Sequence, residues 1–310
     1  RCGGCAYQHI RYEHQLEIKR RQVEDAFGKI AKIAAPEIAP VIGSPQPYAY
    51  RGKATLHAVK TAGEIHLGLM DISGGHVTDI ERCAIMHETI NDQIRRWREG
   101  ELMSSPEQDV TFWSGHHQDS AETVIRRVKN REFAVPGDGF FQTNLCLIDR
   151  MVDEVCRLAQ PGGIETLVDA CCGCGLFSVF LAPYAGRVIG VEIYEKSVRY
   201  ARINAANLGL NNVEFVLSDV TVFLKEMARK KETVDLIVLD PPRAGLDSEA
   251  LAAISEINPS DIIYISCNPA TQARDVGGLR QAGYELRYLQ PLDMFPQTQH
   301  IETVGLLGRR

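Results

Sequence analysis

The sequence predicts an α/β protein in which a smaller, mainly antiparallel β domain precedes a mostly parallel sheet, and three observations predict it. First, buried strand-like runs alternate with helical segments after residue 160, at Thr166–Ala170, Arg187–Glu192, Val213–Leu217, Val234–Asp240 and Asp261–Cys267. This alternation implies right-handed crossovers between parallel strands. Second, the runs Tyr284–Pro291 and His300–Leu307 are too close for a crossover, so we expect an antiparallel edge pair. Third, residues 49–80 alternate between polar and apolar side chains, which is typical of half-buried strands.

The remaining elements follow from periodicity and from turn residues. Residues from Tyr12 to about Ile33 follow a helical pattern, with Leu16, Val23 and Phe27 on one face. A linker punctuated by prolines follows. Further elements are expected as a helix in residues 84–104, a strand at Thr123–Lys129, a helix at Leu145–Ala159 and tight turns at Thr61–Glu64, Gly74-Gly75 and Pro161–Gly163. The predicted domains are a cysteine segment with its helix (1–34), the antiparallel β/α domain (35–136) and the parallel-sheet domain (137–310).

Composition excludes several classes of protein. The chain has 310 residues, 45% of them hydrophobic and 24% charged, as in ordinary globular proteins. No apolar run approaches the roughly 20 residues that cross a bilayer, so we expect no membrane contact. Nine cysteines is an odd number, which argues against a disulfide framework and favours a reducing, cytoplasmic compartment. The formal charge of −6 argues mildly against a nucleic-acid partner, although net charge averages over faces. We expect a monomer.

The chain opens on Cys2-Gly-Gly-Cys5, one residue after Arg1, so we expect its natural start to lie upstream. Two cysteines around a glycine turn have the spacing of metal ligands, because the turn brings both sulfurs to one ion or cluster. A redox dithiol usually follows a strand, and no strand precedes this pair. Cys83 is a candidate third thiolate. Zinc and iron–sulfur both remain open, with His9, His14 and His87 as candidate zinc ligands.

Carboxylates recur where the predicted parallel strands end. Ligands of open α/β sheets bind beyond the carboxyl ends of the strands, so this placement indicates a binding crevice. The first of these strands ends on Asp169 and a glycine turn containing Gly173 and Gly175, which let a ligand approach the backbone. Glu192 ends the next strand, where a carboxylate typically accepts the hydroxyl groups of a ribose. Asp219 follows the third strand and could accept from an adenine amino group, and Asp240 ends the fourth. Loop carboxylates are also commonly helix caps, and this alternative is nearly as strong for Asp219.

Two residues in the carboxyl-terminal part are placed for covalent chemistry. Cys267 follows a buried strand and precedes Asn-Pro, so its thiol would face the crevice and could act as a nucleophile. A buried structural thiol is the ordinary alternative. Glu302 lies between apolar positions of the last strand, where it is either a buried carboxylate with a raised pKa or an ion-pair partner.

A basic run at residues 126–131 includes Arg126 and Arg127, and Arg51 and Lys53 lie on a strand of alternating polarity. Such runs are usually solvated faces. We nevertheless expect these four side chains to contact RNA phosphates.

Five ordered motifs resemble the RNA 5-methyluridine (uracil-C5) methyltransferases of the iron–sulfur-containing 23S rRNA type. They are Cys2-Gly-Gly-Cys5 with Gln8-His9, Phe141-Gln142-x-Asn144, Asp240-Pro-Pro-Arg243-Ala-Gly245, Ser266-Cys267-Asn268-Pro269 and His300-x-Glu302-Thr303. The resemblance covers nearly the whole chain. It implies a class I, Rossmann-like methyltransferase domain with a seven-stranded sheet.

The resemblance also implies roles. Cys267 is the nucleophile, Glu302 the base that removes the C5 proton, and Asp240 the carboxylate that orients uracil. The expected S-adenosylmethionine site consists of Gln142, Asp169, Cys171, Gly173, Gly175, Glu192, Asp219 and Asp240. Cys2, Cys5 and Cys83 match three of the four ligands of the family's [4Fe–4S] cluster.

Three departures from the family pattern are visible. The first cluster cysteine would lie upstream of Arg1, so the cluster could be absent or have three ligands here. The small basic RNA-binding barrel found at the amino end of many relatives is not in this sequence. Cys171 occupies a position where relatives often carry an aromatic residue.

The sequence therefore predicts S-adenosylmethionine-dependent methylation of uracil C5 in RNA, with ribosomal RNA as the expected substrate and transfer RNA as the alternative. Attack of a thiolate on C6 activates C5, and a base must then remove the C5 proton. The base has to be single-stranded or flipped out. Amino-group methylation, which needs no cysteine, is the alternative reaction, and a non-catalytic iron–sulfur RNA-binding module is the alternative class. NAD binding explains neither Cys267 nor Glu302.

Overall fold

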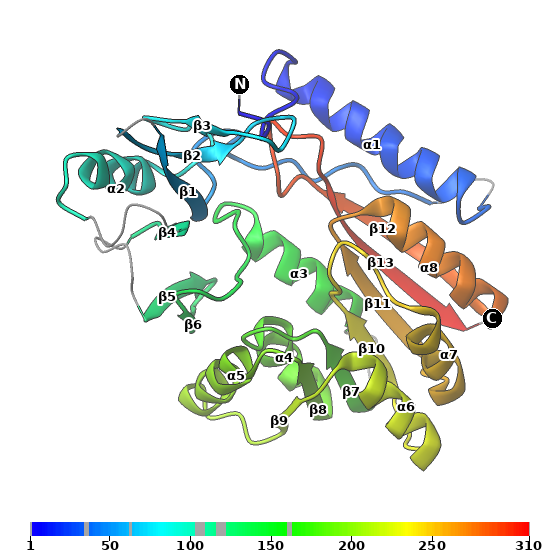
Figure 1. The fold of residues 1–310 in the computed structure, drawn as a ribbon. Coiled ribbons are helices and arrows are strands. Elements are labelled where there is room, and N and C mark those ends of the chain that lie inside the picture. The colour runs from blue at the N-terminus through cyan, green and yellow to red at the C-terminus, as the bar shows by residue number, and fades with distance from the viewer. Residues whose placement is uncertain are drawn as a thin grey trace.

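The structure is a computed structural model, and it describes residues 2–33, 37–61, 64–102, 109–115, 122–159 and 163–309. The centres of two expected turns, at residues 62–63 and 161–162, lie outside the described residues, as does one linker proline, Pro36. Figure 1 shows two parts, a large sheet flanked by helices and a smaller sheet beside it with one helix.

The large sheet has seven strands, ordered β12-β13-β11-β10-β7-β8-β9. Their bounds are β7 Ile164–Ala170, β8 Ala185–Glu192, β9 Val213–Leu217, β10 Leu236–Leu239, β11 Asp261–Ser266, β12 Tyr284–Leu292 and β13 Glu302–Arg309. Neighbouring strands from β11 to β9 are parallel, whereas β13 is antiparallel to both β11 and β12. The expected antiparallel pair is confirmed, with β12 at the edge and β13 inserted between β12 and β11.

Helices cover both faces of this sheet, which explains why its central strands are apolar almost throughout. One face carries α3 Ile148–Ala159, α4 Leu176–Leu181 with the short η1 Ala182–Tyr184, and α5 Glu195–Asn207. The other carries α6 Val220–Lys230, α7 Ser248–Ile257, α8 Pro269–Gln281 and the amino-terminal helix α1 Tyr12–Lys29. Alternate strand residues enter the two cores, Leu167 and Val238 one, Val168 and Ile237 the other. Each such fully buried aliphatic side chain stabilises the fold by roughly 1.5–3 kcal/mol.

Helix α1 buries a different row of side chains from the one expected. Val23 and Phe27 are buried as predicted, but Leu16 is half-buried, and the buried row continues through Lys19 and Gln15. Residues four apart on a helix lie on one face, so these four side chains form one continuous stripe. A hydrophobic pattern could not indicate that its two polar members are fully enclosed.

The smaller sheet is antiparallel, with strand order β3-β2-β1-β4. Its strands are β1 Lys53–Thr61, β2 Glu64–Met70, β3 Val77–Asp79 and β4 Asp109–Trp113, and α2 Glu88–Arg98 packs on it. The predicted alternation is confirmed, because Ala54, Leu56 and Ala58 are buried in one core with Ile90 of α2.

A separate hairpin consists of β5 Thr123–Val128 and β6 Arg131–Pro136. Sequence analysis predicted the first strand but not β6, and it placed the run in the predicted domain of residues 35–136. In the structure the hairpin contacts α5 of the large domain. The Asn204 side chain accepts from the backbone N–H of Ala134 and donates to its carbonyl, which satisfies the free edge of β6. The domain boundary near residue 136 therefore stays a prediction.

Within the described residues, no helix combines the length and apolar character needed to cross a bilayer.

Candidate active site

A cavity of about 810 Å³ lies at the carboxyl ends of the parallel strands. That volume is in the range of small-molecule sites, and the position is the one where open α/β sheets bind ligands. Most of the expected catalytic and cofactor residues line it, namely Gln142, Cys171, Gly173, Glu192, Asp219, Asp240, Cys267 and Glu302. A second hollow, between α6 and α7, is lined by charged surface side chains such as Lys225 and Glu249 and contains no strand end.

The turn after β7 takes a conformation that depends on its glycines. Gly173 and Gly175 both have left-handed backbone angles, with φ of 55° and 81°. A Cβ at Gly173 would meet nothing within 4 Å, so the backbone there is open to the cavity, whereas a Cβ at Gly175 would press on Phe215. Cys171 is also left-handed, with φ of 65°, which is strained for a residue with a side chain. This turn lets a ligand approach the backbone closely.

Glu192 is fixed by backbone donors on both sides. One carboxylate oxygen accepts from Gly173 N at 3.0 Å, and the other accepts from Ile193 N and Tyr194 N at 2.8 Å each. The side chain is half-buried and faces the cavity. Of the roughly four acceptor positions of a carboxylate, three are thus occupied, so Glu192 can still accept from a ligand hydroxyl group.

Asp219 and Asp169 have structural roles that the sequence did not settle. Asp219 is the N-cap of α6 and accepts from Val222 N at 3.1 Å, while still lining the cavity. Asp169 lies beneath the turn, fully buried, and accepts from the N–H and hydroxyl of Ser178 in α4. Its second oxygen has no partner among the described residues. Burial raises the pKa of Asp169 to about 7, and the Ser178 hydrogen bonds oppose that shift.

The order of the strands brings Cys267 next to Glu302. In the antiparallel pairing of β11 with β13, Ser266 lies opposite Thr303. One residue further along each strand, Cys267 therefore faces Glu302. Parallel strand β10 ends beside β11, so Asp240 reaches the same rim. Gln142 Nε2 lies 3.5 Å from Asp240 Oδ2, at the limit of a hydrogen bond.

Burial and mutual repulsion set the protonation of this group. Burial, and then the Asp240 charge, raises the pKa of Glu302 well above its ordinary value, while Arg243 opposes the shift. Burial and the neighbouring Asp169 also raise the pKa of Asp240. Burial, followed by Glu302, raises the pKa of the Cys267 thiol to about 11, again against Arg243. Perturbed groups gathered in one cavity are typical of active sites.

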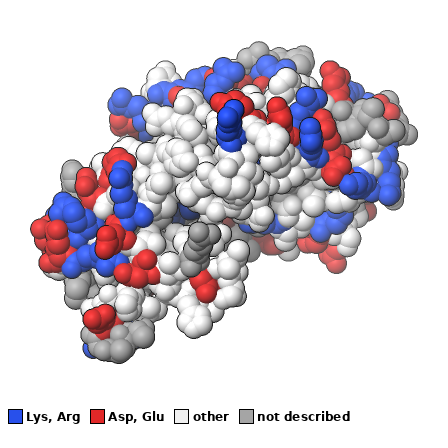
Figure 2. All heavy atoms as spheres, turned by 90° about the horizontal axis from the view of Figure 1, so that it is seen from above, with Lys and Arg blue, Asp and Glu red and all other residues white. Residues whose placement is uncertain are grey.

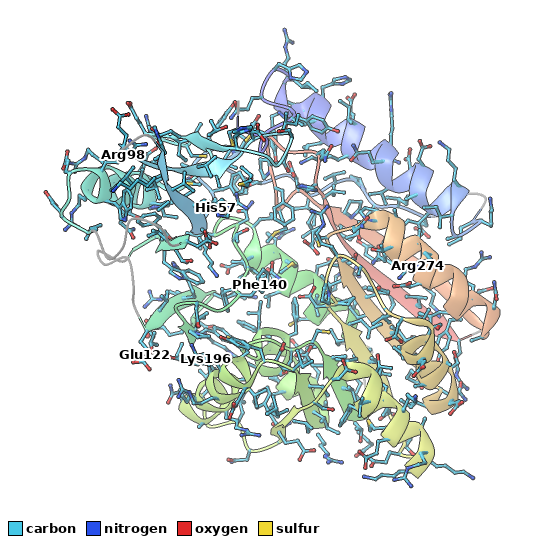
Figure 3. All side chains as sticks on the ribbon, in the orientation of Figure 1. His57, Arg98, Glu122, Phe140, Lys196 and Arg274 are labelled. Carbon is cyan, nitrogen blue, oxygen red and sulfur yellow. The ribbon has the colours of Figure 1, made fainter. Side chains whose placement is uncertain are left out.

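Three further residues line the cavity and received no role from the sequence. Arg243 is exposed and shares a hydrogen bond with His300 at 3.1 Å, so it is the cation beside Glu302 and Cys267. Phe140 is 64% exposed although it is aromatic, and in Figure 3 it lies at the centre of the view, between the smaller sheet and the large one. Phe295 comes from the loop between β12 and β13. Phe140 precedes the quoted motif residue Phe141, and Arg243 is itself part of a quoted motif, which was the available signal.

The predicted metal ligands lie close to one another without forming a ready site. Burial raises the pKa of Cys5 to about 11, and Cys83 and Cys2 add to the shift, so the three thiols are within electrostatic reach. Even so, within the described residues no three His, Cys, Asp or Glu side chains are arranged to hold a metal ion. Two of the three alternative zinc ligands have other partners, since His14 bonds Glu17 and His87 bonds Thr89.

The four predicted RNA-contact residues differ in accessibility. Arg126 is 7% exposed and donates to the carbonyls of Ser114 and Gly52, so it is an internal support rather than part of a basic surface. Lys53 is half-buried and donates to Gly139 O. Arg127 is exposed and pairs with Glu132, and Arg51 is half-buried. In Figure 2 positive and negative side chains are intermixed over the face seen from above.

Comparisons with known proteins agree on one family. The family model described as tRNA (uracil-5-)-methyltransferase matches residues 116–310. An uncharacterized RNA methyltransferase of Halalkalibacterium halodurans is 30% identical over 376 residues, covering 99% of this chain and 81% of the relative. One of Thermosynechococcus vestitus is also 30% identical, covering 99% and 82%.

Solved structures share the fold. The tRNA (uracil-54, C5)-methyltransferase of Pyrococcus abyssi, in complex with S-adenosyl-L-homocysteine, aligns with a TM-score of 0.73 at 23% identity, covering 99% of this chain and 86% of that one. A putative S-adenosylmethionine-dependent methyltransferase of Streptococcus mutans aligns with a TM-score of 0.52 at 15% identity, covering 70% and 64%.

Proposed function

The chain belongs to the tRNA (uracil-5-)-methyltransferase family and is an RNA methyltransferase, and on that premise we propose that it methylates C5 of uracil through a covalent bond between Cys267 and the base. The observation that carries the proposal is the register of β11 and β13, in which Ser266 pairs with Thr303, so that the next residues, Cys267 and Glu302, both lie at the wall of one cavity. Uracil C5 methylation needs a nucleophile and a base beside each other. Amino-group methylation would need no cysteine.

The other half of the cavity suits the methyl donor. The open backbone at Gly173, the acceptor oxygens of Glu192 and the amide of Gln142 are the groups that would hold S-adenosylmethionine. Bound there, the cofactor would supply an electrophilic methyl group. Asp219 and Cys171 also line this part of the cavity, and Asp169 would act from below by holding the turn and α4 together.

The reaction would then proceed by addition of the thiol, methyl transfer and elimination. The Cys267 thiolate adds to C6, and the electrons of the C5–C6 double bond move toward O4. C5 would then accept the methyl group that bound S-adenosylmethionine supplies, with S-adenosylhomocysteine as the leaving group. Glu302 accepts the C5 proton, the double bond re-forms, and the C6–S bond breaks to release Cys267. Asp240, beside both groups, would orient the ring.

Arg243 has an evident place in this scheme. Both chemical groups act as anions, and burial disfavours the anion of each. Arg243 lowers the pKa of Glu302 and of Cys267 against that effect. Its guanidinium would therefore increase the thiolate fraction for attack and the carboxylate fraction for proton removal.

The position of Cys267 in the cavity requires that the substrate uracil be accessible. A stacked, paired uridine cannot present C6 to a thiol at the end of a strand, so the nucleotide would be unpaired or flipped out. Phe140, exposed at the cavity, offers an aromatic face against which a base could stack. Ribosomal RNA of the 23S type remains our expected substrate, with transfer RNA as the alternative.

The first prediction separates the nucleophile from the base. Cys267→Ala should form no covalent species with substrate RNA. In the Glu302→Gln variant, Cys267 should still attack C6 and C5 should still accept the methyl group. The C5 proton should then remain in place, so that elimination of the thiol stalls. Denaturing electrophoresis would then show a protein–RNA adduct with Glu302→Gln alone. Normal turnover by Glu302→Gln, or no adduct from folded protein that binds RNA, would remove Glu302 as the base. Full activity of Cys267→Ala would favour amino-group methylation.

The second prediction concerns the cysteine segment, for which we propose a [4Fe–4S] cluster held in part by Cys2, Cys5 and Cys83. The proposal is supported by the proximity of the three thiols, since Cys83 and Cys2 both raise the pKa of Cys5. It requires the three thiols to move closer together when the cluster binds. Protein prepared without oxygen, with any upstream residues, should absorb broadly near 400 nm, roughly where thiolate-bound iron clusters absorb. Cys83→Ser should lose this absorption, and Cys156→Ser, a thiol of α3, should keep it. Stoichiometric zinc without iron would contradict the proposal.

The third prediction tests the RNA contacts, which we now propose for Arg51, Lys53 and Arg127 but not for the enclosed Arg126. Loss of one phosphate contact should reduce the slope of log affinity against log salt by about 0.7 for single strands. Arg127→Ala should therefore weaken binding and flatten the slope. The matched control is Arg187→Ala, which also removes an exposed arginine paired with a glutamate. Equal slopes for both variants would show that Arg127 only covers a solvated surface.

A further inference from the structure

The loop of residues 293–301, which joins β12 to β13, is enclosed by side chains from distant parts of the chain. It carries Phe295 into the cavity and leads directly into Glu302. In Figure 1 the start of α1, in blue, lies beside the red segment that contains this loop. Glu302 itself pairs with Leu292 in the sheet, and the loop that leads into it is held by these distant partners.

Successive backbone carbonyls of the loop are held by separate donors. Met294 O accepts from Asn144 Nδ2 at 3.2 Å, and Pro296 O accepts from the Tyr50 hydroxyl at 2.9 Å. Phe295 O accepts from Lys19 Nζ at 3.0 Å. These donors come from three segments far apart in the sequence.

Gln297 is held as firmly as its neighbours. Its backbone N–H donates to Gln15 Oε1 at 3.0 Å, its carbonyl accepts from Tyr7 N at 2.9 Å, and its side chain accepts from Gln15 Nε2. Gln297 has a φ of 69°, a left-handed conformation that non-glycine residues adopt only when their surroundings impose it. The loop would not take this shape without the partners that α1 and its preceding segment supply.

Lys19 is the central partner. Its ammonium lies 2.6 Å from Asp293 Oδ1, and neither side chain is exposed to solvent. A buried ion pair is weak evidence for stability, because the desolvation of two charges offsets their attraction, and an apolar pair of similar volume often serves as well. The same ammonium also donates to Phe295 O, so it joins α1 to the loop at two points. An apolar pair could not make the second connection.

We propose that Lys19 is a positioning residue for the reaction, in that its two bonds to the loop place Phe295 in the cavity and align Glu302 with Cys267. This inference rests on the proposed function. Lys19 touches no substrate and acts through the loop. Without it, the loop can shift, and the step most sensitive to that shift is proton removal by Glu302, because proton transfer needs donor and acceptor within hydrogen-bond reach.

The test compares Lys19→Met with Lys29→Met, which removes an exposed lysine of the same helix that pairs with Asp25. Single-turnover reactions with saturating RNA and labelled S-adenosylmethionine yield two quantities, the rate of product release and the fraction of methylated RNA still bound covalently to protein. Lys19→Met should release product at least tenfold more slowly and accumulate the adduct, and Lys29→Met should match the wild type. The adduct fraction is a ratio, so partial unfolding does not change it.

Lys19→Met leaves Asp293 without its partner and could fail to fold. The double variant Lys19→Met with Asp293→Leu removes both charges and should fold, as judged by thermal unfolding, but still lacks the bond from Lys19 to Phe295 O, which keeps its local hydrogen bonds from Thr298. It should therefore keep the adduct accumulation. Tyr50→Phe, which removes one carbonyl donor with little change in volume, should show a smaller effect of the same kind.

The outcomes separate the two proposals. If the wild type forms no 5-methyluridine, the proposed function is wrong. If the wild type is active and the folded double variant has the rate and adduct fraction of Lys29→Met, Lys19 only fastens α1 to the body and the positioning role is wrong.

Discussion

The insertion of β13 between β11 and β12 is the constraint on which the candidate site depends. Strands β7, β8, β10 and β11 deliver residues only at their carboxyl ends. Because β13 runs antiparallel to β11, it delivers its first residue at that same rim. Glu302 can therefore stand opposite Cys267, one step beyond the pair Ser266 and Thr303. If β13 ran parallel to β11, Glu302 would lie at the opposite end of the strands, away from Cys267.

Electrostatics follow from that geometry. Asp240 and Glu302, with Asp169 behind them, are brought together with little solvent, and each pKa is raised first by burial and then by a neighbouring carboxylate. Arg243 opposes this effect at Glu302 and Cys267. The site thus holds a thiol and a carboxylate whose burial disfavours their ionised forms, and Arg243 opposes that effect.

The sequence predicted most of the large sheet, because strands buried on both faces leave long apolar runs. It missed β6, because a hairpin docked on α5 depends on Asn204 and on other contacts distant in sequence. The recurrence of carboxylates at strand ends indicated the cavity residues, because the carboxyl ends of parallel strands lie at the same end of the sheet. The basic run predicted an RNA contact for Arg126, whereas the side chain is enclosed. A hydrophobic pattern could not predict the burial of Lys19, which depends on Asp293 far along the chain.

The central claim is that C5 of uracil receives the methyl group and afterwards loses its hydrogen. The most direct measurement uses RNA carrying tritium at C5 of uridine and methyl-labelled S-adenosylmethionine, and it counts tritium released to water against methyl groups incorporated. The account predicts one tritium released for each methyl group added, and neither event with Cys267→Ala. Methyl incorporation without tritium release would place the methyl group on another atom and contradict the account.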